Sequence, residues 1–102
     1  MATRVVWTLP ARQDVKEIGE YIAQDSRWVA QSVVKRITSA TRNLRLLPRM
    51  GRIVPELDDE DVRELIVFSY RIIYRASRKR VTVWAVIHGA RQLLGALQGR
   101  KF

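Results

Sequence analysis

The 102-residue sequence contains no cysteine and only one histidine. Disulfide bonds and cysteine-based zinc sites are therefore excluded, and so is a metal site built from several histidines. Hydrophobic runs are short, such as the run from Val83 to Ile87, and none has the length of a membrane-spanning helix. The first residues also lack the apolar stretch of a secretory signal. These absences, together with the length, predict a cytoplasmic protein of one domain that does not associate with a membrane.

Sequence patterns for cofactor binding are missing as well. There is no P-loop, dinucleotide fingerprint, zincin motif or nucleophile elbow. The acidic segment Glu56–Asp61 could hold a divalent cation through its carboxylate oxygens, but it lacks the spacing of a calcium loop. A solvated acidic loop is the simpler interpretation. We therefore expect no metal site and no cofactor.

Acidic residues are scarce and unevenly distributed. The net charge is +9, and 15 of the 19 basic residues are arginines. Six of the ten acidic residues lie between Glu56 and Glu64, and none follows Glu64, whereas eight arginines and lysines do. This pattern predicts that the C-terminal third binds an anionic partner, either RNA, DNA or an acidic protein segment. A plain nucleic-acid-binding module, or a basic domain without such a partner, remains an alternative.

Two amphipathic helices are predicted in the first half of the chain. Pro10 suits the first turn of a helix that ends near Gln24, and Asp25 or Ser26 can cap a second helix that Pro48 terminates. Their apolar positions recur at helical spacing: Ala11, Val15, Ile18 and Ile22, then Ala30, Val33, Val34, Ile37, Ala40, Leu44 and Leu47. The short gap between the helices predicts an antiparallel hairpin.

Strand patterns occupy residues 3–7 and most of the second half. The predicted C-terminal strands are Val62–Val67, Tyr70–Ala76 and Val81–His88. The last has Val81, Val83, Ala85 and Ile87 on one face and Trp84 and Val86 on the other. Because both faces are apolar, we expect this strand to be central. The sequence thus predicts an α+β fold over residues 1–98: an N-terminal strand, an antiparallel helical hairpin packed on a small antiparallel sheet, and a short helix within Ala90–Leu97, followed by a flexible basic tail, residues 99–102.

Several short motifs occur in a fixed order along the chain. They are A-x-x-D-V-x-x-I-x-x-Y-I (Ala11, Asp14, Val15, Ile18, Tyr21, Ile22), P-R-x-G-R (Pro48, Arg49, Gly51, Arg52), R-E-L (Arg63, Glu64, Leu65), Y-R-I-x-Y (Tyr70, Arg71, Ile72, Tyr74) and V-x-H-G-x-R (Val86, His88, Gly89, Arg91). In their order and spacing they resemble the ParE/RelE toxin superfamily over about residues 4–97, and the predicted sandwich is that superfamily's fold.

This resemblance implies the toxin of a type II toxin–antitoxin system, which a cognate antitoxin neutralises. RelE-like members cleave mRNA on the ribosome, whereas ParE-like members inhibit DNA gyrase by binding it. RelE-like nucleases usually carry a catalytic Tyr or His close to the C-terminus, and the segment after Arg91 has neither. The resemblance therefore favours the ParE-like branch, with gyrase as target and no enzymatic activity.

The alternative is a metal-independent endoribonuclease that acts on the ribosome and mRNA. Such cleavage needs a base, a cation beside the phosphate and an acid. Glu64 could be the base, Arg71 or Arg75 the cation and His88 the acid, if these strand residues share a face. Each also has a structural interpretation: an ion pair with an arginine for Glu64, solvated strand positions for the arginines, and a cap on the turn before Gly89 for His88.

Binding surfaces follow from the resemblance and from the predicted fold. The candidates for target binding, from the position of the C-terminal region in ParE-like toxins, are His88, Arg91, Leu93, Leu94 and Leu97. An acidic, disordered antitoxin could fold onto the helical hairpin and an open sheet edge. The candidates for that contact are Tyr21, Trp28 and Val29. For the leucines and for these three residues, packing in the core is the alternative.

Overall fold

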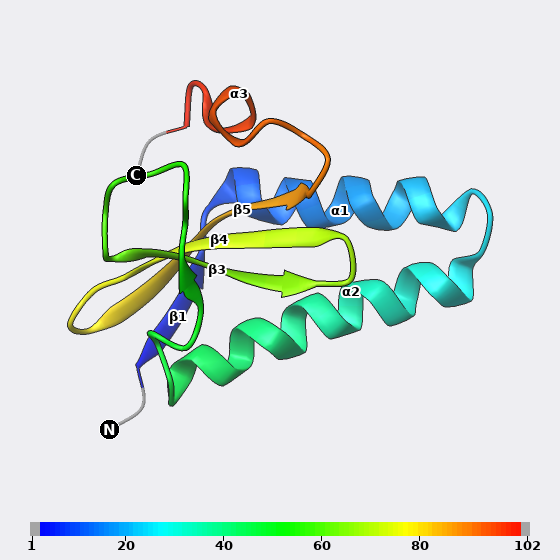
Figure 1. The fold of residues 1–102 in the computed structure, drawn as a ribbon. Coiled ribbons are helices and arrows are strands. Elements are labelled where there is room, and N and C mark those ends of the chain that lie inside the picture. The colour runs from blue at the N-terminus through cyan, green and yellow to red at the C-terminus, as the bar shows by residue number, and fades with distance from the viewer. Residues whose placement is uncertain (1–2, 101–102) are drawn as a thin grey trace.

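A computed structural model describes residues 3–100, which form one five-stranded sheet with helices on both of its faces (Figure 1). The elements are β1 (Arg4–Trp7), α1 (Leu9–Ala23), α2 (Arg27–Arg42), the 3-10 turn η1 (Asn43–Arg45), β2 (Arg52–Ile53), β3 (Val62–Val67), β4 (Tyr70–Ala76), β5 (Arg80–His88) and α3 (Leu93–Leu97). Within residues 3–100, no helix is long and apolar enough to cross a membrane. The predicted α+β class, helical hairpin and short C-terminal helix are confirmed.

The strands lie in the order β1-β5-β4-β3-β2, so β5 is central, as predicted. The pairs β2–β3, β3–β4 and β4–β5 are antiparallel, which confirms the predicted small antiparallel sheet, but β1 runs parallel to β5, with Arg4 opposite Arg80. The N-terminal strand therefore makes the complete sheet mixed, which the sequence did not predict. Strand direction here depends on where the helical hairpin returns the chain, which the residue pattern of β1 does not encode.

Both long helices begin at polar caps. The Thr8 Oγ1 accepts a hydrogen bond from the Ala11 backbone N–H (3.1 Å), and Ser26 caps α2 in the same way, as predicted. α2 ends at Arg42, earlier than its apolar spacing predicted, and Leu47 is exposed after the 3-10 turn. α1 and α2 form the expected antiparallel pair (Figure 1).

Apolar side chains form a core on each face of the sheet. α1 and α2 cover one face, which we call the hairpin face. α3 and the segment that precedes β3 cover part of the other, the open face. The open face is only partly covered, and the charged residues Glu64 of β3 and Arg71 and Arg75 of β4 lie there.

A bulge in β5 changes the faces that its residues occupy. Ile73 pairs with Ala85 but Tyr74 pairs with Val83, so Trp84 is an extra residue in the ladder. The predicted strict alternation along β5 is therefore wrong. The hairpin-face core contains Val81, Val83 and Val86, and the open-face core contains Trp84, Ala85 and Ile87.

The predicted tail, residues 99–102, is described only as far as Arg100. The Arg100 guanidinium donates hydrogen bonds of 2.7 Å to both carboxylate oxygens of Asp14 in α1 and one of 2.9 Å to the Trp84 carbonyl. The Asp14 carboxylate raises the pKa of this guanidinium. Residues 101 and 102 lie outside the described range. The ion pair with Asp14 thus holds the chain against α1 as far as Arg100.

Candidate functional site

The side chain of Glu64 in β3 is buried on the open face of the sheet. The residue is 1% exposed and lies opposite Ile73, which belongs to the open-face core. Its Oε1 is 2.6 Å from the Arg71 Nε, and its Oε2 is 2.5 Å from the Arg52 Nε. A buried carboxylate is tolerated when it is paired and hydrogen-bonded. Both oxygens of Glu64 are therefore bound by arginines.

Arg71 in β4 connects this carboxylate to the acidic segment. Its two terminal nitrogens donate hydrogen bonds of 2.7 and 2.8 Å to the carboxylate of Glu56, a bidentate pair. The Arg71 hydrogen bonds lower the pKa of Glu56, and Glu56 together with Glu64 raises the pKa of Arg71. Arg71 therefore remains charged, and all three of its guanidinium nitrogens donate to carboxylates within this network.

A turn before β2 packs against the same network. The Gly51 N–H donates to the buried Tyr74 hydroxyl (3.0 Å), whose pKa is raised by burial. A Cβ on Gly51 would lie 2.5 Å from the Glu64 carbonyl oxygen, so only glycine fits at this position. Arg49 in this turn is paired with Asp61 at 2.5 Å. The P-R-x-G-R, R-E-L and Y-R-I-x-Y motifs thus form one connected scaffold.

Arg75 lies on the same face as Glu64 and Arg71, because its partner in the sheet is Val62 of the open-face core. Its guanidinium is 2.9 Å from the Asp59 carboxylate and 5.2 Å from the centre of the Trp84 ring. Glu64, Arg71 and Arg75 therefore lie on one surface, and each has an ion-pair partner.

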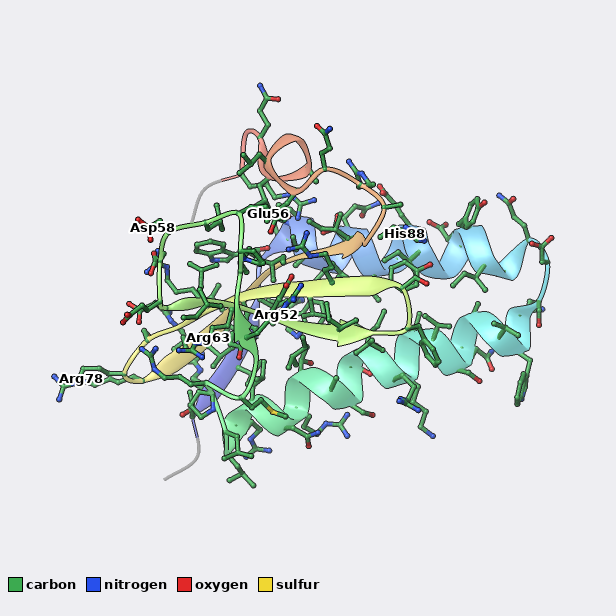
Figure 2. The ribbon with its side chains drawn as sticks, in the orientation of Figure 1. Arg52, Glu56, Asp58, Arg63, Arg78 and His88 are labelled. Carbon is green, nitrogen blue, oxygen red and sulfur yellow. The ribbon has the colours of Figure 1, made fainter. Side chains whose placement is uncertain are left out.

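His88 lies on the hairpin face, away from these three residues. It is opposite Tyr70, whose ring meets the imidazole edge-on with centroids 5.5 Å apart, and Tyr70 packs against the hairpin-face core. Figure 2 shows His88 near α1, at a distance from Arg52 and Glu56. The imidazole Nδ1 accepts a hydrogen bond from the Ala90 N–H (3.1 Å). In the structure His88 thus caps its own turn.

The bulge at Trp84 is the reason for this separation. Counted by strict alternation from Val83, which faces the hairpin, His88 would lie on the same face as Glu64. The extra residue reverses that parity. No periodicity in the sequence indicates the bulge, so the convergence of His88 with Glu64 could not be judged from the sequence.

The candidates for target binding divide into surface and core. His88 and Arg91 are exposed and line a hollow of about 490 Å³ between α1 and the end of β5, together with Tyr21. Leu94 in α3 is 62% exposed. Leu93 and Leu97 are buried in the open-face core and support α3 from beneath. Three of the five predicted residues therefore offer side chains to a partner.

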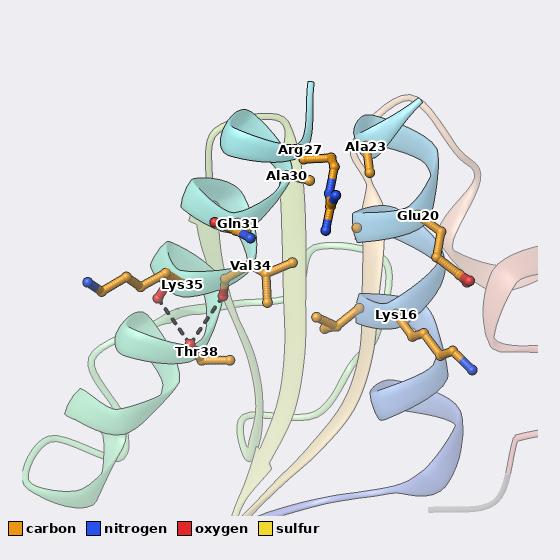
Figure 3. A pocket seen from close by; sticks show the side chains of 11 residues that line it. Lys16, Glu20, Ala23, Arg27, Ala30, Gln31, Val34, Lys35 and Thr38 are labelled. Atoms are coloured by element: carbon orange, nitrogen blue, oxygen red, sulfur yellow. Dashed lines mark hydrogen bonds between the residues drawn. The ribbon is translucent and has the colours of Figure 1, made fainter. Parts of the chain in front are cut away.

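The outer surface of the helical hairpin carries a separate groove of about 590 Å³ (Figure 3). Its walls come from both helices: Val15, Lys16, Gly19, Glu20, Ala23, Arg27, Ala30, Gln31, Val34, Lys35 and Thr38. A Cβ on Gly19 would lie 3.3 Å from a methyl group of Val34, so the missing side chain allows the close approach of the helices. Three cations and one acid therefore surround an apolar floor.

Sequence reasoning did not identify this groove. Its signal is the small or apolar residue at every fourth position of α1, which is Val15, Gly19 and Ala23. The predicted antitoxin contacts lie elsewhere on the hairpin. Trp28 and Tyr21 are exposed by 76% and 72%, and neither they nor Val29 line the groove.

The acidic segment has a structural use in the described part of the chain. Glu56, Asp59 and Asp61 are paired with arginines of the sheet and the preceding turn. Among residues 3–100, no group of three His, Cys, Asp or Glu side chains could hold a metal ion. The sequence predicted a solvated acidic loop, whereas three of its carboxylates are paired with arginines of the sheet and the preceding turn.

Comparison with known proteins gives consistent matches along nearly the whole chain. The family model described as the ParE toxin of type II toxin-antitoxin system, parDE, matches residues 5–93. The protein Y4kP of Sinorhizobium fredii is 38% identical over 94 residues, which cover 87% of this chain and 91% of that protein. Toxin RelE2 of Caulobacter vibrioides is 34% identical over 89 residues, which cover 86% and 97%.

Solved structures show the same fold. A structure of the chromosomal ParDE toxin–antitoxin system from P. aeruginosa matches with a TM-score of 0.71 and 19% identity, over 85% of this chain and 96% of that one. The toxin–antitoxin complex RelBE2 from Mycobacterium tuberculosis matches with a TM-score of 0.62 and 18% identity, over 86% and 99%. The arrangement of helical hairpin and sheet is thus shared with these toxin–antitoxin structures.

Proposed function

Because the chain belongs to the ParE toxin family of type II toxin–antitoxin systems, we propose that it arrests growing cells by binding and inhibiting DNA gyrase. A co-expressed antitoxin neutralises it by covering its surface. The ParE-like pattern of the C-terminal segment, with no Tyr or His after Arg91, supports gyrase as the target.

One observation carries the choice of inhibition over mRNA cleavage. His88 and Glu64 lie on opposite faces of the sheet. Metal-independent cleavage needs its base and acid on either side of the same phosphate. Moreover, both carboxylate oxygens of Glu64 are held by arginines, so a base at this position would first have to break two ion pairs.

The surface that we assign to gyrase lies at the end of β5 and on α3. His88 and Arg91 provide polar groups beside the 490 Å³ hollow, and Leu94 provides an exposed apolar group. Interfaces commonly combine an arginine with apolar anchors. This surface is small but contains both.

The test is inhibition of DNA supercoiling by purified gyrase. The wild-type toxin should inhibit it, and Arg91→Ala should raise the concentration needed by at least about tenfold, because a charge-assisted contact contributes about 1.5 kcal/mol or more. Arg12→Ala is the matched control, since Arg12 is also an exposed arginine but does not line the hollow, and its loss should leave inhibition unchanged.

Two results would contradict the proposal. One is a toxin that arrests growth while gyrase retains full activity in its presence. The other is cleavage of ribosome-bound mRNA that Glu64→Gln abolishes in a variant with a native circular dichroism spectrum, because the network around Glu64 would then be catalytic.

The groove on the helical hairpin is the surface that we assign to the antitoxin. Its apolar floor suits the apolar stripe of an amphipathic helix, and Lys16, Arg27 and Lys35 around it suit acidic flanks on that helix (Figure 3). Trp28 and Tyr21 extend the exposed apolar surface beyond the groove.

A pair of substitutions at one groove position tests this assignment. Ala23→Glu and Ala23→Lys introduce side chains of similar length and opposite charge. If the antitoxin is acidic here, the Glu variant should bind the cognate antitoxin at least about tenfold more weakly than the Lys variant does. Titration calorimetry measures both affinities. Equal affinities would show that the partner is not acidic here, and affinities equal to wild type would show that the groove is not used.

A further inference from the structure

The turn between β4 and β5 and the start of β1 together form a cluster of cations. The cluster, which we call the basic tip, consists of Arg4, Arg78, Lys79 and Arg80, all exposed. Parallel pairing brings Arg4 opposite Arg80, and the Arg4 N–H donates to the Lys79 carbonyl at 3.4 Å. Residues far apart in the sequence therefore meet where the neighbouring strands β1 and β5 begin.

The charges of the basic tip are not neutralised within residues 3–100. The six ion pairs in this range use Arg49, Arg52, Arg71, Arg75 and Arg100, and none includes a residue of the basic tip. Figure 2 shows Arg78 extending from the turn between β4 and β5, away from the sheet. The carboxylates of the acidic segment pair with other arginines, so among the described residues they do not neutralise the basic tip.

Two adjoining hollows lie at the basic tip. One, of about 700 Å³, is lined by Ser77 and the four residues of the basic tip. The other, of about 510 Å³, shares Ser77 and Arg80 with the first and continues past Thr8 and Thr82. The hydroxyls of Ser77 and Thr8 already donate to the backbone carbonyls of Arg80 and Trp84, so the donors left for a ligand are the cationic groups of the basic tip. Guanidinium and ammonium groups donate hydrogen bonds to phosphate oxygens.

The character of this depression points to a nucleic acid rather than a protein segment. A protein partner of useful affinity needs apolar anchors, and no strongly exposed large apolar side chain lines either hollow. It also points to a duplex rather than a single strand, which is held mainly by stacking on exposed rings. Two tryptophans line the second hollow. Trp84 is 3% exposed and covered by Arg75, and Trp7 is partly buried and packs against the hairpin-face core, so neither ring projects freely as a stacking platform.

We propose that the basic tip binds the sugar–phosphate backbone of duplex DNA. The site is distinct from the hairpin groove and from the surface around His88 and Arg91, and it goes beyond the proposed inhibition of gyrase. Four cations can contact about four phosphates, so binding should not depend on sequence but should depend strongly on salt.

The experiment measures the fluorescence anisotropy of a labelled short DNA duplex with the purified wild-type chain over a series of salt concentrations. The logarithm of the binding constant should fall with the logarithm of salt concentration with a slope of about −3.6, which corresponds to about four phosphate contacts. The double variant Arg78→Ala/Lys79→Ala should reduce the slope to about −1.8, since two contacts are lost.

The matched control is the double variant Arg12→Ala/Lys35→Ala, which removes the same charge from exposed helix positions. It should keep the wild-type slope. If both variants reduce the slope equally, the DNA is attracted only by net charge, and the proposal is wrong.

Two further probes are included in the same assay. A single-stranded oligonucleotide that binds more tightly than the duplex would overturn the assignment to duplex DNA, and a polyglutamate peptide that displaces the duplex at equal charge concentration would indicate an acidic protein partner instead. Gyrase is absent from this assay, so its outcome is independent of whether gyrase is the target.

Discussion

Replacing Glu64 by alanine should lower the free energy of unfolding by about 3 kcal/mol, because removal of one member of a buried ion pair leaves an uncompensated charge and a cavity. Arg71 would lose a carboxylate partner while its guanidinium stays largely buried, since its side chain is only 11% exposed. Arg71 keeps Glu56 as a partner, and Arg52 is largely exposed, so the loss should not exceed this range.

Urea unfolding monitored by tryptophan fluorescence measures this loss, provided that the dependence on urea concentration is unchanged. Glu60→Ala is the matched control: Glu60 is an exposed acid with no ion pair among the described residues, and its loss should change stability by no more than about 0.5 kcal/mol. Equal effects of the two substitutions would mean that the network around Glu64 contributes nothing to folding.

Gly51→Ala should destabilise the protein by about 3 kcal/mol, at the upper end of what overpacking costs, because the new methyl group meets backbone rather than a movable side chain. The Cβ would lie 2.5 Å from the Glu64 carbonyl oxygen and 2.7 Å from the Tyr74 hydroxyl. Either β3 must shift or the Gly51–Tyr74 hydrogen bond must break. Thermal unfolding followed by circular dichroism should show a clear fall in Tm.

Two comparisons make the Gly51 result specific. Adding Tyr74→Phe to Gly51→Ala should not restore stability, since the contact with the backbone oxygen remains. Gly95→Ala in α3 should instead stabilise by about 0.5 to 1 kcal/mol, since no atom within 4 Å meets its Cβ and alanine favours the helix. A destabilisation of similar size at both glycines would show that the close contact at Gly51 is not the cause.

The motifs that resemble the superfamily have a structural role in this chain. The arginines and Glu64 that make the chain resemble a nuclease site hold the acidic segment against the sheet through ion pairs. The surfaces left for partners are the hairpin groove, the region of His88 and Arg91, and the basic tip. A single small domain can therefore present several partner surfaces and still keep its central charges paired.

Much of the architecture could be predicted from local patterns. The helical spacing from Ala11 to Ile22 and the β-branched runs from Val62 onward identified the helices and the strands of the second half. The cap at Ser26 and the central position of β5 were also predicted. These features depend on neighbouring residues or on the apolar character of one segment, which a sequence displays directly.

What only the tertiary structure decided are relations between distant segments. The direction of β1, the bulge at Trp84 and the hollow between α1 and α2 each depend on how elements far apart in the chain meet. The bulge has the largest consequence, since one extra residue moves His88 to the face opposite Glu64. The sequence by itself determined that the chain is strongly basic, with most of its acidic residues in one segment. The tertiary structure decided which arginines are neutralised and which, at the basic tip, remain available to a polyanion. The reason is that ion pairs form only where the fold brings opposite charges within contact distance.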